Sequence, residues 1–162
     1  LVENLKRIEC YDISNISGVY ATGSMVVFTN GEKDSQWYRR FKIKLNKGPN
    51  DFAMIQEVLT RRFNHKEWPL PDLLIVDGGK GQVSAALKTI KQFNNTPGGE
   101  ASLTIPVIGL AKREETIITS GFKQIILPKD SDVLKLIMKI RDEAHRFAIA
   151  YHRKLRSKNF LN

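Results

Sequence analysis

Residues Leu70 to Gln82 read Leu-Pro-Asp-Leu-Leu-Ile-Val-Asp-Gly-Gly-Lys-Gly-Gln, and this stretch decides the fold. The apolar run Leu73 to Val76 is typical of a short strand buried on both faces. Asp77 follows at the carboxyl end of that strand, the edge at which open α/β sheets bind ligands. Apolar residues at helical spacing then begin at Val83. A carboxylate at this edge, beside glycines and Lys80, indicates metal and phosphate chemistry.

Two plainer interpretations of this stretch have to be weighed. An Asp after a strand often only caps the next helix, and the stretch alone leaves that reading open for Asp77. A phosphate-binding Walker loop is excluded, because Leu74 stands where its first glycine belongs and Gly81 where Ser or Thr would bind Mg²⁺. We expect Gly78, Gly79 and Gly81 to let the backbone turn tightly.

Size and charge restrict the protein class. The 162 residues fit a single domain, 1–162, with a substantial core. The 26 Lys and Arg outnumber the 17 Asp and Glu, giving a net charge of +9. This charge favours a polyanion partner, with nucleic acid first, although a basic surface can also serve only solubility.

Several features concern location. The single Cys10 excludes an internal disulfide and fits a reducing compartment, so we expect a cytoplasmic protein. The sequence contains no secretory segment and no apolar run long enough to span a membrane. It begins at Leu1 rather than Met, which indicates a fragment of a longer protein.

The amino-terminal part predicts three antiparallel strands. Residues 7–14 form the first, which carries Asp12, and residues 22–29 form the second. Asn30-Gly31 is a strong hairpin signal, because both residues tolerate positive φ. Alternating apolar residues over 36–45 predict a third strand, in which Arg39 should point toward the apolar side or its rim.

The middle of the chain predicts helices alternating with strands. A helix-start signal at 48–51 precedes an apolar stripe at helical spacing, which consists of Phe52, Ile55, Val58, Leu59 and Phe63. The helix that follows Asp77 should end in the polar loop 94–99. Residues 105–111 form another short apolar strand.

The carboxyl-terminal part predicts a β-hairpin excursion and a long helix. The hairpin strands are 116–119 and 124–127, and Asp130 or Ser131 can cap the helix that follows. The helix covers about residues 132–158, which contain no Gly or Pro. Its core stripe is Leu134, Ile137, Ala144, Phe147, Tyr151 and Leu155. His145 lies one residue off this stripe, on a flank that it shares with Arg141, Ala148, Ile149 and His152.

The predicted order is βββαβαβ, a hairpin and a long helix, in a mixed α/β sheet. This succession is typical of a ribonuclease H-like fold. Such folds place one Asp in the first strand, a second at the end of a neighbouring strand, and a further ligand on the final helix. Asp12, Asp77 and His145 occupy these places, although a single His on a helix is more often structural.

The chain also resembles a known family, the carboxyl-half endonuclease domain of UvrC, the incising subunit of bacterial nucleotide excision repair. The matching stretches span nearly the whole chain in order: Arg7 to Ser14, Tyr38 to Phe41, Asp51 to Arg62, Pro71 to Gln82, Gly109 to Arg113, Arg141 to Ala148 and Tyr151 to Arg156.

The resemblance implies an endonuclease that cuts the damaged strand on the 5′ side of a lesion. The catalytic residues of the family fall on Asp12, Asp77 and His145, and a further acidic position falls on Asp51, for which a plain helix cap is an equal explanation. Many members carry His where this sequence has Asn15, so the role of that imidazole does not transfer. The family's UvrB-binding segment has no counterpart in this sequence.

Phosphodiester hydrolysis suits this set of residues. Two divalent ions roughly 4 Å apart can activate water and neutralise phosphoryl charge, and carboxylate oxygens suit Mg²⁺ or Mn²⁺. We assign Asp12 as the bridging ligand, Asp77 as the ligand of one metal, and His145 as a completing or flanking group or an acid–base. Candidate DNA-backbone contacts, each of which can also be a plain surface charge, are Arg39, Lys80, Arg146, Arg153, Lys154 and Arg156.

Three functional hypotheses therefore compete. A metal-dependent DNA endonuclease is the leading one. A ribonuclease H-like module that binds nucleic acid or a partner without cutting is the second, and Asn15 leaves room for it. A nucleotide-binding enzyme is weakened by the missing Walker pattern.

Overall fold

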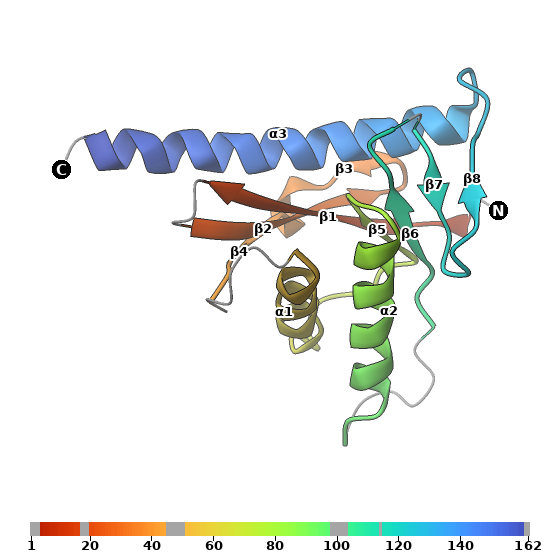
Figure 1. Ribbon diagram of the computed structural model, residues 1–162, viewed down its shortest axis with the longest axis horizontal. Helices are drawn as coiled ribbons and strands as arrows, with labels where there is room; N and C mark the ends of the chain where they lie inside the picture. Colours follow the sequence, from red (N-terminus) through yellow and green to blue (C-terminus); the bar gives the residue numbers. More distant parts are fainter. Residues whose placement is uncertain (1–3, 17–19, 45–50, 98–103, 114, 161–162) are drawn as a thin grey trace.

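One mixed sheet with helices on both faces organises the described part of the chain (Figure 1). The computed structural model describes residues 4–16, 20–44, 51–97, 104–113 and 115–160, without the side chains of 15, 16, 20, 155, 159 and 160. The elements are β1 (Arg7–Ile16), β2 (Tyr20–Thr29), β3 (Glu32–Lys33), the 3₁₀ helix η2 (Ser35–Trp37), β4 (Arg39–Lys42), α1 (Asp51–Phe63), β5 (Leu73–Val76), α2 (Lys80–Asn94), β6 (Val107–Leu110), β7 (Ile117–Ile118), β8 (Gln124–Ile125) and α3 (Asp132–Phe160).

Strand β1 lies near the middle of the sheet. The strand order is β3-β2-β1-β5-β6-β7-β8, and β4 pairs with the same strand, β2, as β3 does. The pairs β1–β5 and β5–β6 are parallel, whereas β1–β2, β6–β7 and β7–β8 are antiparallel. The parallel pairs bring the carboxyl ends of β1, β5 and β6 to one edge, as the sequence predicts for a ligand site.

The two faces of the sheet are covered by different helices. Tyr11 of β1 belongs to the core cluster that includes Ile55 of α1 and Val83 of α2. Its neighbour Cys10 points to the other face and belongs to the cluster that includes Ile140 of α3. Figure 1 shows α3 running across one face, with α1 and α2 on the opposite one.

The amino-terminal prediction is confirmed for the first two strands, and for the third it is confirmed only over Arg39–Lys42. Asn30 and Gly31 form the hairpin with φ of 52° and 80°. Only two residues of β3 pair before the chain turns at Asp34, whose carboxylate accepts a hydrogen bond from the hydroxyl of Thr29. Residues 35–37 then form η2, so pairing with β2 resumes only at Arg39. The predicted strand 36–45 is therefore shorter, and 45 lies outside the described residues.

The middle helices agree with the sequence pattern except at three residues of α1, one of which is Met54, buried although it lies off the predicted stripe. Phe52, placed on the apolar stripe, is 49% exposed, and its ring lies where a side chain on Gly81 would stand. Arg62, off the stripe, is fully buried. The helix-start residues 48–50 and the loop end 98–99 lie outside the described residues.

The carboxyl-terminal hairpin is confirmed, but it is part of the sheet rather than an excursion. Strand β7 pairs with β6, so β7 and β8 extend the main sheet at its edge. Ser131 caps α3, because its hydroxyl accepts a hydrogen bond from the backbone N–H of Leu134. Ile140 is buried on α3 although the predicted stripe omits it, and the side chain of Leu155 lies outside the described part.

None of the helices in the described ranges has both the length and the apolar composition needed to span a bilayer.

Candidate active site

Asp12 and Asp77 are neighbours because of the register between two parallel strands. Tyr11 of β1 pairs with Val76 of β5, and the Asp77 N–H donates to the Tyr11 carbonyl at 3.0 Å. The next residue along each strand is an aspartate, on strands that lie about 4.8 Å apart. Because side chains alternate, both carboxylates point to the face that α3 covers.

His145 reaches the pair from α3. Its Nδ1 lies 3.5 Å from Asp12 Oδ2, and its side chain is 65% exposed whereas that of Asp12 is 11% exposed. The structure thus brings together the three residues that the sequence selected from positions more than 130 residues apart. The imidazole of His145 is therefore exposed to solvent, whereas the carboxylate of Asp12 is largely buried.

These residues line a cavity of about 460 Å³ at the carboxyl edge of the sheet. Its lining comes from β1, α3, the starts of α1 and α2 and the segments that follow β5 and β6: Asp12, Ile13, Ser14, Asp51, Asp77, Gly78, Gly79, Gln82, Ala111, Lys112, His145, Ala148 and Ile149. Asp51, the further acidic candidate, therefore lies at the same cavity, at the exposed start of α1.

The glycine-rich turn after β5 is shaped by close packing. A Cβ on Gly109 of β6 would stand 2.6 Å from the Gly78 carbonyl oxygen, so the two segments meet through backbone. The Gly79 N–H donates to the side chain of Gln82, which fixes the turn at the start of α2. Positive φ does not explain the predicted tight turn, since Gly31 is the glycine of the described chain that has it.

The two carboxylates disfavour each other's charge. Burial and the nearby Asp77 raise the pKa of Asp12 to about 6, although His145 and Lys112 oppose the shift. Burial also raises the pKa of Asp77, against the opposing charges of Arg141, Lys112 and His145. For both carboxyls burial is the largest cause of the raised pKa, so the neutral form is favoured more than in water.

The raised pKa of Asp12 predicts a pH-dependent stability of the metal-free domain. The Asp12 carboxyl has an ordinary pKa of 3.8 and a folded pKa of about 6, so the folded state binds the extra proton between these values. The resulting stabilisation is complete below about pH 4 and is lost as the pH rises through 6.

The substitution Asp12→Asn removes this effect. At pH 7 we expect it to raise the free energy of unfolding by on the order of 2 kcal/mol. Urea denaturation in EDTA at pH 4 and pH 7 measures the difference between the variant and the wild type. An equal difference at both pH values would contradict the assignment.

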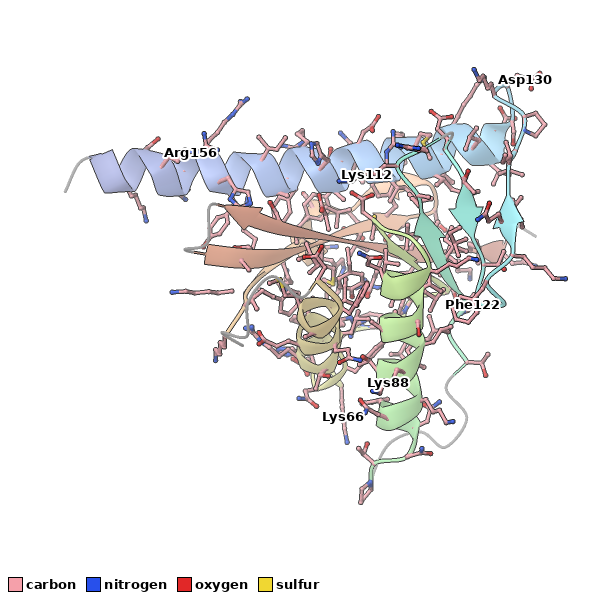
Figure 2. All side chains as sticks on the ribbon, in the orientation of Figure 1. Lys66, Lys88, Lys112, Phe122, Asp130 and Arg156 are labelled. Atoms are coloured by element: carbon pink, nitrogen blue, oxygen red, sulfur yellow. The ribbon has the colours of Figure 1, made fainter. Side chains whose placement is uncertain are left out.

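The predicted DNA-contact residues fall into different places. Arg146 and Arg153 line a second cavity of about 510 Å³, which shares His145 and Ile149 with the first. Lys80 is exposed at the start of α2. Lys154 and Arg156 are exposed farther along α3, and the second of them is labelled in Figure 2.

Arg39 is not brought to this site. Arg39 of β4 pairs with Met25 of β2, whose side chain belongs to the core on the α1 and α2 face. Its guanidinium lies 4.9 Å from the ring centroid of Trp68 and donates to the carbonyl oxygens of Gln36 and Tyr38. The expectation that Arg39 points to the apolar rim is confirmed, on the face opposite to Asp12.

Lys112 is the functional candidate that the sequence reasoning passed over. It follows β6, is exposed, and acts electrostatically on both aspartates (Figure 2). The available signal was its place in the stretch Gly109 to Arg113, directly after a strand parallel to β5. The side chain of Asn15 lies outside the described part of the structure.

The family comparison bears on this geometry. A family model for the UvrC RNase H endonuclease domain matches residues 1–149. The chain belongs to this family. The ribonuclease H-like fold expected from the element order is thereby confirmed.

Relatives of the UvrC domain have similar sequences over nearly the whole chain. UvrABC system protein C from Methanosphaera stadtmanae is 47% identical over 166 residues, which cover 95% of this chain and 26% of that protein. The corresponding protein of Methanococcoides burtonii is 50% identical over 157 residues, covering 93% and 25%. The chain therefore spans about a quarter of the length of these relatives.

Solved structures show a more distant likeness to the UvrC domain. The catalytic domain of human endonuclease V aligns with a TM-score of 0.48 at 20% identity, over 68% of this chain and 46% of that one. Ciona intestinalis endonuclease V in complex with DNA gives 0.46 at 17% identity, over 86% and 57%. Nothing about the site follows from similarity at this level.

A metal site is predicted here from donor chemistry alone. Within the described ranges, His, Cys, Asp and Glu side chains do not converge in groups of three or more that could hold an ion. The ligand roles of Asp12, Asp77 and His145 therefore remain predictions.

Proposed function

We propose that this domain hydrolyses a DNA phosphodiester with divalent-metal assistance and makes the 5′ incision next to a lesion in nucleotide excision repair. The main support is one observation, the pair of part-buried carboxylates on adjacent parallel strands with an imidazole at 3.5 Å from one of them. Membership of the UvrC RNase H endonuclease family points to the same chemistry.

The carboxylate oxygens of Asp12 and Asp77 are the type of donor that suits Mg²⁺ or Mn²⁺. Burial raises the pKa values of Asp12 and Asp77, and a divalent cation between them would favour their charged forms. In this proposal Asp12 and Asp77 would hold the metal, and His145 would complete or flank the site. The bound ions would supply an activated water and neutralise charge on the phosphoryl group.

The chain's own cations would hold the substrate. Lys112 faces both carboxylates and is placed to pair with a phosphoryl oxygen. Arg146 and Arg153 border the adjoining cavity and can bind the strand beyond the cut. Contacts to phosphate position a strand without reading its sequence, which suits cleavage at any lesion.

The partners proposed for the whole protein are damaged duplex DNA and UvrB. Because the chain spans about a quarter of its relatives, the segment that would bind UvrB is assigned to the remainder of the protein. This domain then contributes the incision and not the recognition of damage.

The test combines metal binding with strand cleavage. Calorimetric titration of Mn²⁺ is run with and without a short duplex, and supercoiled plasmid is incubated with Mn²⁺, Mg²⁺ or EDTA. We expect one ion site to be weak until DNA phosphate is present, and nicking to require the ion. Two equally tight ion sites in the absence of DNA would contradict the expected weak site. Binding of metal and DNA without nicking would favour the non-cutting module.

Salt dependence tests the phosphate contacts. Replacing Arg153 with Ala should weaken duplex binding and flatten the slope of log affinity against log salt by about 0.9, the contribution of one phosphate contact. Fluorescence anisotropy between 50 and 200 mM salt, roughly the range in which such contacts are lost, measures the slope. Lys88→Ala is the control, because Lys88 is exposed on α2 behind the sheet (Figure 2); equal slopes in the two variants would remove Arg153 from the interface.

A further inference from the structure

A second contact joins β1 to α3 next to the Asp12–His145 pair. Ser14 Oγ is in hydrogen-bond contact with His152 Nε2. Ser14 lies two residues beyond Asp12 on the same side of β1, and His152 lies about two helical turns beyond His145. Ser14 lines the candidate active-site cavity, as does Ala148, which is between the two histidines on α3.

The ring of His152 is buried in an unusual way. The residue is only 6% exposed. Its second nitrogen, Nδ1, is buried and has no hydrogen-bond partner among the residues that the structure describes. Burial and the charge of Arg156 lower the pKa of His152, so the ring is neutral near pH 7.

A neutral ring carries its proton on one nitrogen only. A proton on Nδ1 would leave a buried N–H without an acceptor, and orphaned N–H donors are rarer in proteins than acceptors lacking a partner. The favoured tautomer therefore has the proton on Nε2, where it is donated to Ser14 Oγ. In this arrangement the Ser14 hydroxyl proton is not used by His152 and is free to be donated into the cavity.

We infer that the Ser14 hydroxyl donates a hydrogen bond to a non-bridging phosphoryl oxygen of the strand bound in the cavity, and that His152 is the positioning residue that keeps this donor free. The inference rests on the proposed function, because it assigns a phosphodiester to the cavity. It adds a neutral donor two residues beyond Asp12 on β1, whereas Lys112 belongs to the segment that follows β6.

Three variants test whether the Ser14–His152 contact serves phosphate binding or only holds β1 against α3. Ser14→Ala removes the donor. His152→Gln keeps an amide N–H near the position of Nε2, and His152→Leu removes it while keeping bulk. Circular dichroism and thermal unfolding of all three establish that they fold before any functional comparison.

The first readout is the protonation of the ring, which requires neither metal nor cleavage. Nitrogen-15 NMR of the histidines in the wild-type chain distinguishes a protonated from a bare ring nitrogen. We expect protonated Nε2 and bare Nδ1 for His152 at pH 7. The opposite tautomer means that Ser14 donates to the ring, and it overturns the inference.

The second readout uses DNA with a single phosphorothioate of defined stereochemistry at the cleaved position. We expect Ser14→Ala and His152→Leu to slow cleavage of normal DNA by about 10- to 100-fold, as for loss of a hydrogen bond to a charged group, and His152→Gln to retain most activity. One sulfur diastereomer should slow the wild type more than it slows Ser14→Ala, because sulfur is a poor acceptor. Equal sulfur effects in the two proteins contradict phosphate contact by Ser14.

Failure of the proposed function is distinguishable from failure of this inference. If the wild-type chain does not cut, the same variants are compared by their affinity for uncleaved duplex carrying each sulfur diastereomer. Weaker binding by Ser14→Ala, with loss of the stereochemical preference, would still support the contact. Unchanged binding and preference would reject it.

Discussion

Replacing either Asp12 or Asp77 with Asn should reduce strand cleavage by roughly a thousandfold or more, because each is proposed as a metal ligand and the loss of such a ligand removes several kcal/mol of transition-state stabilisation. The amide keeps the shape of the side chain but not the charge that would hold the cation. Single-turnover cleavage of a lesion-containing duplex at saturating Mn²⁺ measures the change. Calorimetry of the same variants should show weaker ion binding.

If Asp12 is a catalytic residue, the loss of cleavage in Asp12→Asn does not come from unfolding of the variant. The raised pKa of Asp12 means that its charge is unfavourable to the metal-free fold, so Asp12→Asn should be at least as stable as the wild type near pH 7. Asp130→Asn serves as the matched control, because Asp130 is exposed in the connection between β8 and α3 (Figure 2). Cleavage by Asp12→Asn at the rate of the Asp130→Asn control would remove Asp12 from the catalytic assignment.

The largest loss of stability is expected at Glu9, on the opposite face of the sheet. Its fully buried carboxylate accepts hydrogen bonds from Arg62 at 2.7 Å, from Arg7 at 3.0 Å and from the Tyr11 hydroxyl at 2.6 Å. Glu9→Ala leaves the buried Arg62 without its counter-ion, which typically costs about 3–5 kcal/mol. Urea denaturation of the variant measures the loss.

An exposed acid provides the comparison for Glu9. Glu32 lies 3.8 Å from Lys139, and its side chain is 83% exposed. Glu32→Ala should change the free energy of unfolding by under about 1 kcal/mol. A similar small effect at Glu9 would show that water reaches Arg62 in the folded protein.

The network around Glu9 also shows where sequence patterns fail. Glu9 occupies a polar position in the alternating pattern of β1, and Arg62 lies off the apolar stripe of α1. Neither pattern therefore indicates that these two residues are buried. Arg62 further donates to the Pro69 carbonyl, so one guanidinium ties β1, α1 and the segment before β5 together. Charged residues are ordinarily assigned to the surface, and only the pairing of two of them across 53 positions overrides this rule.

The third strand was misjudged for a related reason. Alternation over 36–45 is a real signal for Arg39 to Lys42, but it does not report the η2 turn that interrupts pairing. The hydrogen bond of Asp34 to Thr29 and the pairing of Asp34 N–H with the Val27 carbonyl are local features that stop β3 after two residues.

By itself the sequence determined the element types, the buried strand that ends at Asp77, and three site candidates in three separate segments. Hydrophobic periodicity and turn residues are local properties of the chain, so they can be identified from the sequence alone. Tertiary structure alone decided which residues meet: Lys112 facing the aspartates, Ser14 against His152, and Arg39 turned to the other face. These contacts depend on strand register and on the rotation of α3, and both are set by packing between segments far apart in the chain.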